Sequence, residues 1–204
     1  MEKTNVESNI YFAGIDPSLT ATAIVIIDKD GKLISSHVIS TKFIGPQRLI
    51  YIANSSLSEL HSLTKPVELV CIEHYAMNCK FGRETAGELG GVLRVMMYEN
   101  LLEYQEIPPL QLKQFAIGKA TAEKDHILMA VYKKWGIEFW KNDEADAFIL
   151  AQMARAIYMV KNNADIKLTA YELEVIQNII NPAKKTKKKK LYNERQEAQK
   201  CNQN

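Results

Sequence analysis

Four acidic residues stand at points in the chain from which their carboxylates could meet. Asp16 closes the apolar run IYFAGID and Glu73 closes the run VELVCIE, while Asp143 and Asp146 begin an apolar stretch, three residues apart. On a helix that spacing puts both carboxylates on one face near the N-terminus. Four converging carboxylates repel one another unless a cation neutralises them. Their oxygens suit Mg²⁺ or Mn²⁺, and two such ions about 4 Å apart can promote phosphodiester hydrolysis.

Each acid taken alone also has a simpler interpretation. Asp16 precedes Pro17 and could be an ordinary turn residue. Asp143 could be an acid that complements the positive end of a helix dipole. The chain order, the apolar context and the three-residue spacing together favour a metal-binding cluster over four unrelated acids.

The elements that must position these acids can be read from the hydrophobic pattern. Runs over 10–16, 21–28 and 33–40 predict three consecutive antiparallel strands with tight connections, and 67–73 predicts a fully buried fourth strand. A short strand is expected near 104–107. Helices are expected over 46–63, about 85–100, 110–116, 121–135 and 143–159. This order of elements predicts an α/β domain built on a mixed sheet with flanking helices.

Composition sets the broad class of the protein. The 204 residues carry a net charge of +2, with 47% hydrophobic and 25% charged residues, which is ordinary for a globular chain. No apolar run reaches the roughly 18 residues of a membrane span, and the first residues lack a signal-peptide pattern. We therefore expect a cytoplasmic protein without a membrane partner. Three cysteines without a CxxC pair argue against a zinc site.

Positive charge is concentrated at the C-terminal end. Residues 161–204 contain ten Lys and Arg against five Asp and Glu, and the densest part is KKTKKKK at 184–190. One amphipathic helix is expected over about 168–180, and the polar residues 182–204 are expected to be a flexible basic tail. Such a run could bind phosphates or could merely solubilise the chain.

Four stretches resemble the RuvC-type Holliday junction resolvases. They are GIDPSLTATAIVIID from Gly14, VCIEHYAM from Val70, LKQFAIGKATAEKDHI from Leu112 and DEADAFILAQ from Asp143. The resemblance covers residues 10–158, and motifs in this order and spacing are specific. The Lys- and Asn-rich composition and the appended arm resemble phage members, which would place the protein in a host cytoplasm.

This resemblance implies a ribonuclease H-like fold and crossover junction endodeoxyribonuclease activity. A homodimer would nick two opposing strands of a four-way DNA junction with Mg²⁺, or Mn²⁺, at two ions per site. The implied metal ligands are Asp16, Glu73, Asp143 and Asp146. The implied domains are a nuclease domain over 9–160 and an extension over 161–204.

The resemblance also implies which residues touch DNA. Lys113 and Lys124 would contact or polarise the phosphate being cut, although an exposed helix face is the simpler interpretation of both. An aromatic residue after the second acid would stack on unpaired bases, and Tyr75 and Phe81 are the candidates. The other expected phosphate contacts are Lys80, Arg83 and Lys119.

Glycines in the helix over 85–98 suggest a further contact surface. Gly87, Gly90 and Gly91 each cost about 1 kcal/mol relative to alanine inside a helix. Their presence indicates close approach by a second subunit or by DNA, or else ordinary tight packing on the sheet. One site per chain also favours a dimer, because paired nicks on a two-fold substrate need two sites.

Two other functions remain as alternatives. A ribonuclease H-like fold could bind ATP, but such proteins need a second Gly-rich phosphate loop, and no DxGxT or GGxG element follows residue 100. A catalytically inactive DNA-binding relative is also conceivable, although retention of all four acids argues against it. Fold-level analogy alone would decide neither question.

Overall fold

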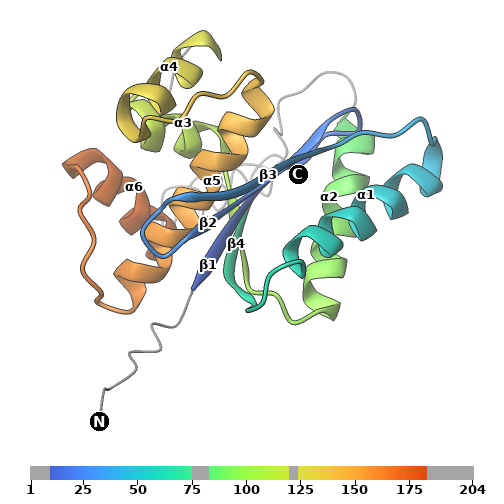
Figure 1. Ribbon diagram of the computed structural model, residues 1–204, viewed down its shortest axis with the longest axis horizontal. Helices are drawn as coiled ribbons and strands as arrows, with labels where there is room; N and C mark the ends of the chain where they lie inside the picture. The colour runs from blue at the N-terminus through green and yellow to red at the C-terminus, as the bar shows by residue number, and fades with distance from the viewer. Residues whose placement is uncertain (1–9, 75–82, 120–123, 183–204) are drawn as a thin grey trace, which may run out of the picture.

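A computed structural model describes residues 10–74, 83–119 and 124–182 of the chain. One mixed sheet runs in the order β3-β2-β1-β4-β5, in which β2 is antiparallel to both β1 and β3, while β1, β4 and β5 are parallel to one another (Figure 1). The strands are β1 (Tyr11–Asp16), β2 (Thr22–Asp28), β3 (Leu33–Ile39), β4 (Val67–Glu73) and β5 (Tyr104–Ile107). The expected mixed-sheet α/β class and all five expected strands are confirmed.

Helices cover both faces of the sheet, which explains why β1, β2 and β4 read as continuous apolar runs. α1 and α2 lie on one face, and α5 lies on the other with α3, α4 and α6 beside it (Figure 1). The helices are α1 (Gly45–Leu60), α2 (Arg83–Glu99), α3 (Pro109–Ile117), α4 (Lys124–Trp135), α5 (Asn142–Lys161) and α6 (Ala170–Ile180). Each expected helix is confirmed, with ends shifted by a few residues.

The closest approach between layers is that of α5 to β1. A Cβ atom on Gly14 would overlap the carbonyl oxygen of Ala147 and the amide nitrogen of Ala151, so only glycine fits there. α5 is apolar around most of its circumference, and nearly every residue from Ala145 to Ile157 is buried. A helix of this kind belongs in a core rather than at a surface. The absent side chain of Gly14 therefore lets the backbone of α5 rest directly on β1.

Two of the three glycines in α2 do not pack closely on the sheet, which was one predicted explanation for them. Gly90 is buried, but a Cβ on Gly87 or Gly91 would meet no described atom within 4 Å. Tight packing on the sheet is therefore wrong as an explanation for Gly87 and Gly91. The intermolecular interpretation of these two glycines is still a prediction.

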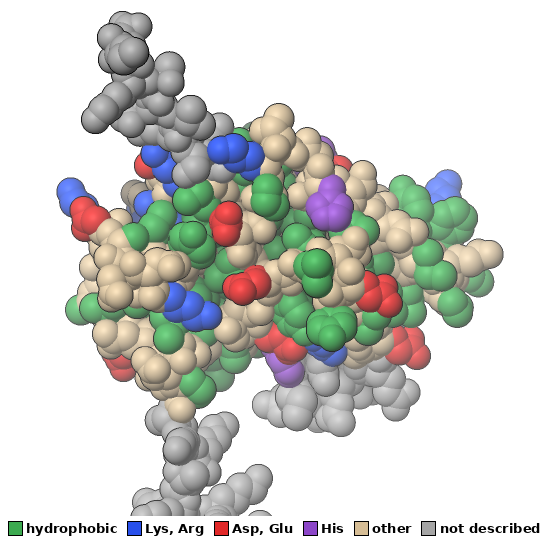
Figure 2. Space-filling model, turned by 90° about the horizontal axis from the view of Figure 1, so that it is seen from below, with side chains coloured by type: hydrophobic (Ala, Val, Ile, Leu, Met, Phe, Trp, Pro, Cys, Tyr) green, Lys and Arg blue, Asp and Glu red, His purple; other side chains and the backbone are tan. Residues whose placement is uncertain are grey.

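The outer surface of α1 and α2 is unusually apolar. Its most exposed large residues include Ile50, Tyr51, Val95 and Tyr98, the last of them 79% exposed. A groove of about 640 Å³ runs between the two helices and includes Val92 and Gly91 in its lining. Hydrophobic side chains also gather at the end of the molecule that α1 forms (Figure 2, right).

The expected C-terminal extension begins where α5 ends. Its helix α6 contributes Val175 and Ile176 to the core that also contains α3, α4 and α5, so this helix is packed on the body. The expected basic tail over 182–204 lies almost wholly outside the described residues. Within the described ranges, no helix is long and apolar enough to cross a membrane.

The Gly14 contact gives a direct test of the fold. We expect Gly14→Ala to destabilise the protein by about 1–3 kcal/mol or more, because the added methyl group meets backbone atoms that cannot turn aside. Urea unfolding followed by circular dichroism measures the change. Asn178→Ala, at an exposed position of α6 (Ala170–Ile180), is the control and should change the free energy of unfolding by less than about 0.5 kcal/mol. Equal stability of the Gly14 variant and the wild type would contradict the proposed contact.

Candidate active site

Strand register brings Asp16 and Glu73 side by side. β1 and β4 run parallel with Ile15 paired to Ile72, so the next residue on each strand is one of these two acids. Their side chains form a hydrogen bond with each other.

α5 and α3 bring three more charges to Glu73. Burial raises the pKa of Glu73 above its ordinary value, whereas the hydrogen bond with Asp16 lowers it. The negative charges of Asp146 and Asp143 raise the pKa of Glu73 further, and the positive charge of Lys113 lowers it. Asp143 and Asp146 lie in the first two turns of α5, and Lys113 lies in the middle of α3. The four acids predicted from the sequence and one of the two lysines therefore meet at one edge of the sheet.

The turn after Asp16 is fixed by its own side chains. The buried Thr22 hydroxyl donates to the carbonyl of Ser18 at 2.6 Å and accepts from the Ser18 amide at 3.0 Å. Hydroxyl-to-backbone bonds of this kind stabilise short connections. The bonds close the link between β1 and β2 and so hold the end of β1 beneath α5.

A second set of charges, whose pairing the sequence analysis missed, lies on the opposite face of the sheet from Glu73, toward α2. His74 follows Glu73 and places Nε2 at 3.4 Å from Oε2 of Glu106 on β5. Arg94 of α2 places its guanidinium at 3.6 Å from the same oxygen. The parallel pairing of β4 with β5 is what brings Glu106 beside His74. Alternation along a strand could have signalled this arrangement, since it turns His74 away from the side of its neighbour Glu73.

The donor set fits a hard divalent cation by chemistry. Carboxylate oxygens dominate it, and the buried Oδ1 of Asn142, beside Asp143, has no hydrogen-bond partner among the described residues. Within the same residues, however, no group of three or more His, Cys, Asp or Glu side chains is arranged to hold a metal ion as it stands. The hydrogen bond between Asp16 and Glu73 is one reason, because it engages oxygens that a cation would need. Metal binding here would displace a proton and turn side chains toward a common point.

The other predicted contact residues are only partly described. Lys119 is exposed just beyond the end of α3. Lys124 begins α4 and Arg83 begins α2, but their side chains lie outside the described part of the structure. Tyr75, Lys80 and Phe81 also lie outside it. An aromatic residue that the sequence analysis did not select, Trp140, is 87% exposed three positions before Asp143.

A family model described as crossover junction endodeoxyribonuclease RuvC matches residues 12–154, which is well over half of the chain. The chain belongs to the RuvC family. A RuvC from Synechococcus sp. strain WH7803 is 29% identical over 145 residues, covering 68% of this chain and 93% of that relative. A second, from strain CC9902, is 28% identical over 145 residues with the same coverage.

Solved RuvC structures share the fold. Thermus thermophilus RuvC superimposes with a TM-score of 0.59 at 24% identity, covering 76% of this chain and 97% of that chain. The same protein in complex with Holliday junction substrate gives a TM-score of 0.59 at 21% identity, covering 75% of this chain and 96% of that chain. The expected family, its ribonuclease H-like fold and its class of metal-dependent endodeoxyribonucleases are thereby confirmed. RuvC membership also favours the nuclease over the ATP-binding alternative.

The crowding of acids predicts opposite stability effects with and without metal. We expect Asp146→Asn to raise the melting temperature in EDTA, because it removes one negative charge from beside Glu73. With saturating Mg²⁺ or Mn²⁺ the wild type should gain more stability than the variant, because bound ligand stabilises the folded state. Asp165→Asn, at an exposed site in the loop after α5, is the matched control. Thermal melts that respond equally to metal in all three proteins would argue against a metal site at Asp146.

Proposed function

We propose that this protein is a metal-dependent endodeoxyribonuclease that resolves four-way DNA junctions by paired symmetric nicks. The proposal rests above all on the meeting of Asp16, Asp143, Asp146 and Lys113 around Glu73 in a chain of the RuvC family. The complex of Thermus thermophilus RuvC with Holliday junction substrate supports the choice of substrate.

The four acids would act as ligands for two ions, Mg²⁺ or Mn²⁺. Bound divalent cations supply the charge that activates a water and stabilises the leaving oxygen in phosphodiester hydrolysis. Asp16 and Glu73 would turn their carboxylate oxygens to the ions. Lys113, from the opposite side of the cluster, would stabilise negative charge on the phosphate being cut.

Other side chains would hold the DNA in place. Lys119 and Lys124 would contact phosphates near the cut, and the basic run over 184–190 would add affinity without sequence preference. Tyr75 or Phe81 would stack on an unpaired base, with Lys80 and Arg83 on neighbouring phosphates. Forks and flaps are further substrates to compare, because branched DNA of several kinds shares the same local features.

The cleavage reaction is tested directly with labelled DNA. Four-way junction, fork, flap and linear duplex are incubated with the full chain in Mg²⁺, Mn²⁺ or EDTA. We expect paired symmetric nicks on the junction and none in EDTA. Asp16→Asn and Asp146→Asn should lose at least about 10²-fold in cleavage rate, since each removes a metal ligand, while junction binding persists. Asp165→Asn serves again as the control and should cut normally.

The outcomes separate the competing functions. Equal cutting of linear duplex would refute junction resolution while leaving a nuclease. Junction binding without cutting in either metal would favour the catalytically inactive relative instead.

A homodimer is the second part of the proposal. Two copies related by a two-fold axis would present two sites to a two-fold junction. The apolar face of α1 and α2, with Ile50, Val95, Tyr98 and the open space over Gly87 and Gly91, supports this face as the contact between copies. Contiguous exposed apolar surface of this kind is typical of association sites.

The dimer is tested by analytical ultracentrifugation. We expect the wild type to sediment as a dimer and Val95→Asp to sediment as a monomer, because a charge placed within an apolar contact is left unpaired. Met129→Asp on α4, at a residue that is also about half exposed, is the matched control and should remain dimeric. A wild type that stays monomeric with and without junction DNA would refute the dimer.

A further inference from the structure

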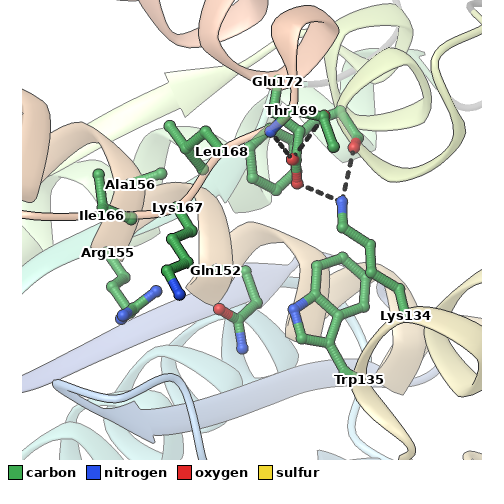
Figure 3. Close-up of a pocket in the computed structure, with 11 residues that line it drawn as sticks. Lys134, Trp135, Gln152, Arg155, Ala156, Ile166, Lys167, Leu168, Thr169 and Glu172 are labelled. Atoms are coloured by element: carbon green, nitrogen blue, oxygen red, sulfur yellow. Dashed lines mark hydrogen bonds and ion pairs between the residues drawn. The ribbon is translucent and has the colours of Figure 1, made fainter.

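α3, the helix that carries Lys113, is held from behind by the C-terminal helix α6. Lys134 of α4 donates to Glu172 of α6 and also to the carbonyl oxygen of Phe115, at 3.3 Å. Phe115 is two residues beyond Lys113 in the same helix. Figure 3 shows Lys134 reaching up to both oxygens from beside Trp135. We refer to Lys134, Phe115, Thr169 and Glu172 together as the α6 latch.

Burial makes the α6 latch a strong interaction. The side chain of Glu172 is only 5% exposed and that of Lys134 is 25% exposed. The Glu172 carboxylate also accepts from the amide and hydroxyl of Thr169, at 2.7 and 2.6 Å, in the capping box that begins α6. These partners compensate the buried negative charge of Glu172. Removing the cation would leave that charge unpaired and lower the free energy of unfolding.

Aromatic rings enclose the ammonium group of Lys134. It lies 4.3 Å from the ring centre of Trp135, 5.0 Å from that of Phe115 and 5.7 Å from that of Tyr171. Cations over ring faces at such distances are attracted to them. Tyr171 also packs on Gly118, the left-handed residue that ends α3. α6 therefore contacts α3 near its middle through Lys134 and at its end through Tyr171.

We propose that Lys134 and Glu172 are positioning residues for the nuclease reaction, which act by holding α3 so that Lys113 faces Glu73. This inference rests on the proposed function. It gives the C-terminal extension a role that the family match does not cover, since that match ends at residue 154 and Glu172 lies beyond it. A helix of nine residues has little rigidity of its own, so its buried residues Leu112, Phe115 and Ala116 and the α6 latch together decide where Lys113 lies.

The test compares two variants that lose both bonds of Lys134, to Glu172 and to Phe115, with one that loses only the bond to Glu172. Lys134→Met loses the links to Glu172 and to Phe115, and it leaves the Glu172 carboxylate buried without its cation. Lys134→Met/Glu172→Gln also loses both links but removes that carboxylate. Glu172→Gln alone keeps the link to Phe115. Lys133→Met, at the exposed neighbouring lysine, and Glu174→Gln, at an exposed acid of α6, are the matched controls.

Three measurements are made on the full chain: melting temperature, amide hydrogen exchange over 109–118 without DNA, and single-turnover cleavage at saturating junction. We expect Lys134→Met to melt earliest, to exchange faster over 109–118, and to cleave about tenfold more slowly, since small displacements of catalytic groups cost up to 10²-fold. The double variant should recover stability but stay about as slow, because Phe115 is still released. Glu172→Gln should cleave about threefold to fivefold more slowly, because Lys134 can still reach Phe115 but has lost the carboxylate that fixes it there, and both controls should cleave within about twofold of wild type.

Each contrary result has a distinct meaning. Cleavage that recovers together with melting temperature in the double variant would reduce the α6 latch to a stability role. Unchanged exchange over 109–118 in Lys134→Met would overturn the holding of α3 itself. If the wild type cuts no branched DNA, the nuclease proposal fails and the catalytic role fails with it, while the exchange result still decides whether Lys134 orders α3.

Discussion

Carboxylates that share a site repel one another, and a chain gathers them only where its backbone leaves no alternative. Here two rigid contacts impose the meeting. The parallel register of β1 and β4 aligns Asp16 with Glu73, and the seat of α5 on Gly14 brings Asp146 to the same edge. Both contacts lie between buried backbones, so they hold the acids close together despite the repulsion between their charges. The apolar cores on the two faces of the sheet offset the electrostatic cost.

The positive side of the site is carried by a short helix. Lys113 comes from the nine-residue α3, which is anchored in the core by Leu112, Phe115 and Ala116. The carbonyl of Phe115 in α3 is bound by Lys134 of α4, and Lys134 is bound in turn by Glu172 of α6. Residues of three helices that are far apart in the sequence therefore help to position the ammonium group of Lys113. Because Val175 and Ile176 of α6 share one core with α3, α4 and α5, this part of the predicted extension over 161–204 packs on the same body as the helix that carries Lys113.

Much of this architecture could be predicted from local pattern. Runs of β-branched residues identified the strands, and the three-residue spacing of Asp143 and Asp146 identified one helix face, because both signals depend on neighbours in the sequence. Contacts between distant segments could not be predicted in the same way. The pairing of Lys134 with Glu172 spans 38 residues, and each alone is an ordinary charge on an amphipathic helix. The prediction that Gly87 and Gly91 pack tightly on the sheet was wrong for a related reason. A glycine in a helix indicates that a neighbour comes close, but it does not identify that neighbour.

The direct backbone contact between α5 and β1 at Gly14 also limits where the chain can accept insertions and deletions. Ala147 and Ala151 flank Gly14 from successive turns of α5, and Asp143 and Asp146 follow the same turns upstream. One residue inserted between Asp146 and Ala147 would rotate the acids by about 100° around the helix axis and carry them off the sheet edge. In the loop from Asn162 to Leu168, the exposed residues 162–165 have no such constraint, since Ile166 and Leu168, which pack on the core, come after them. Among natural variants, we expect insertions and deletions to collect in that loop and to be absent from the first half of α5.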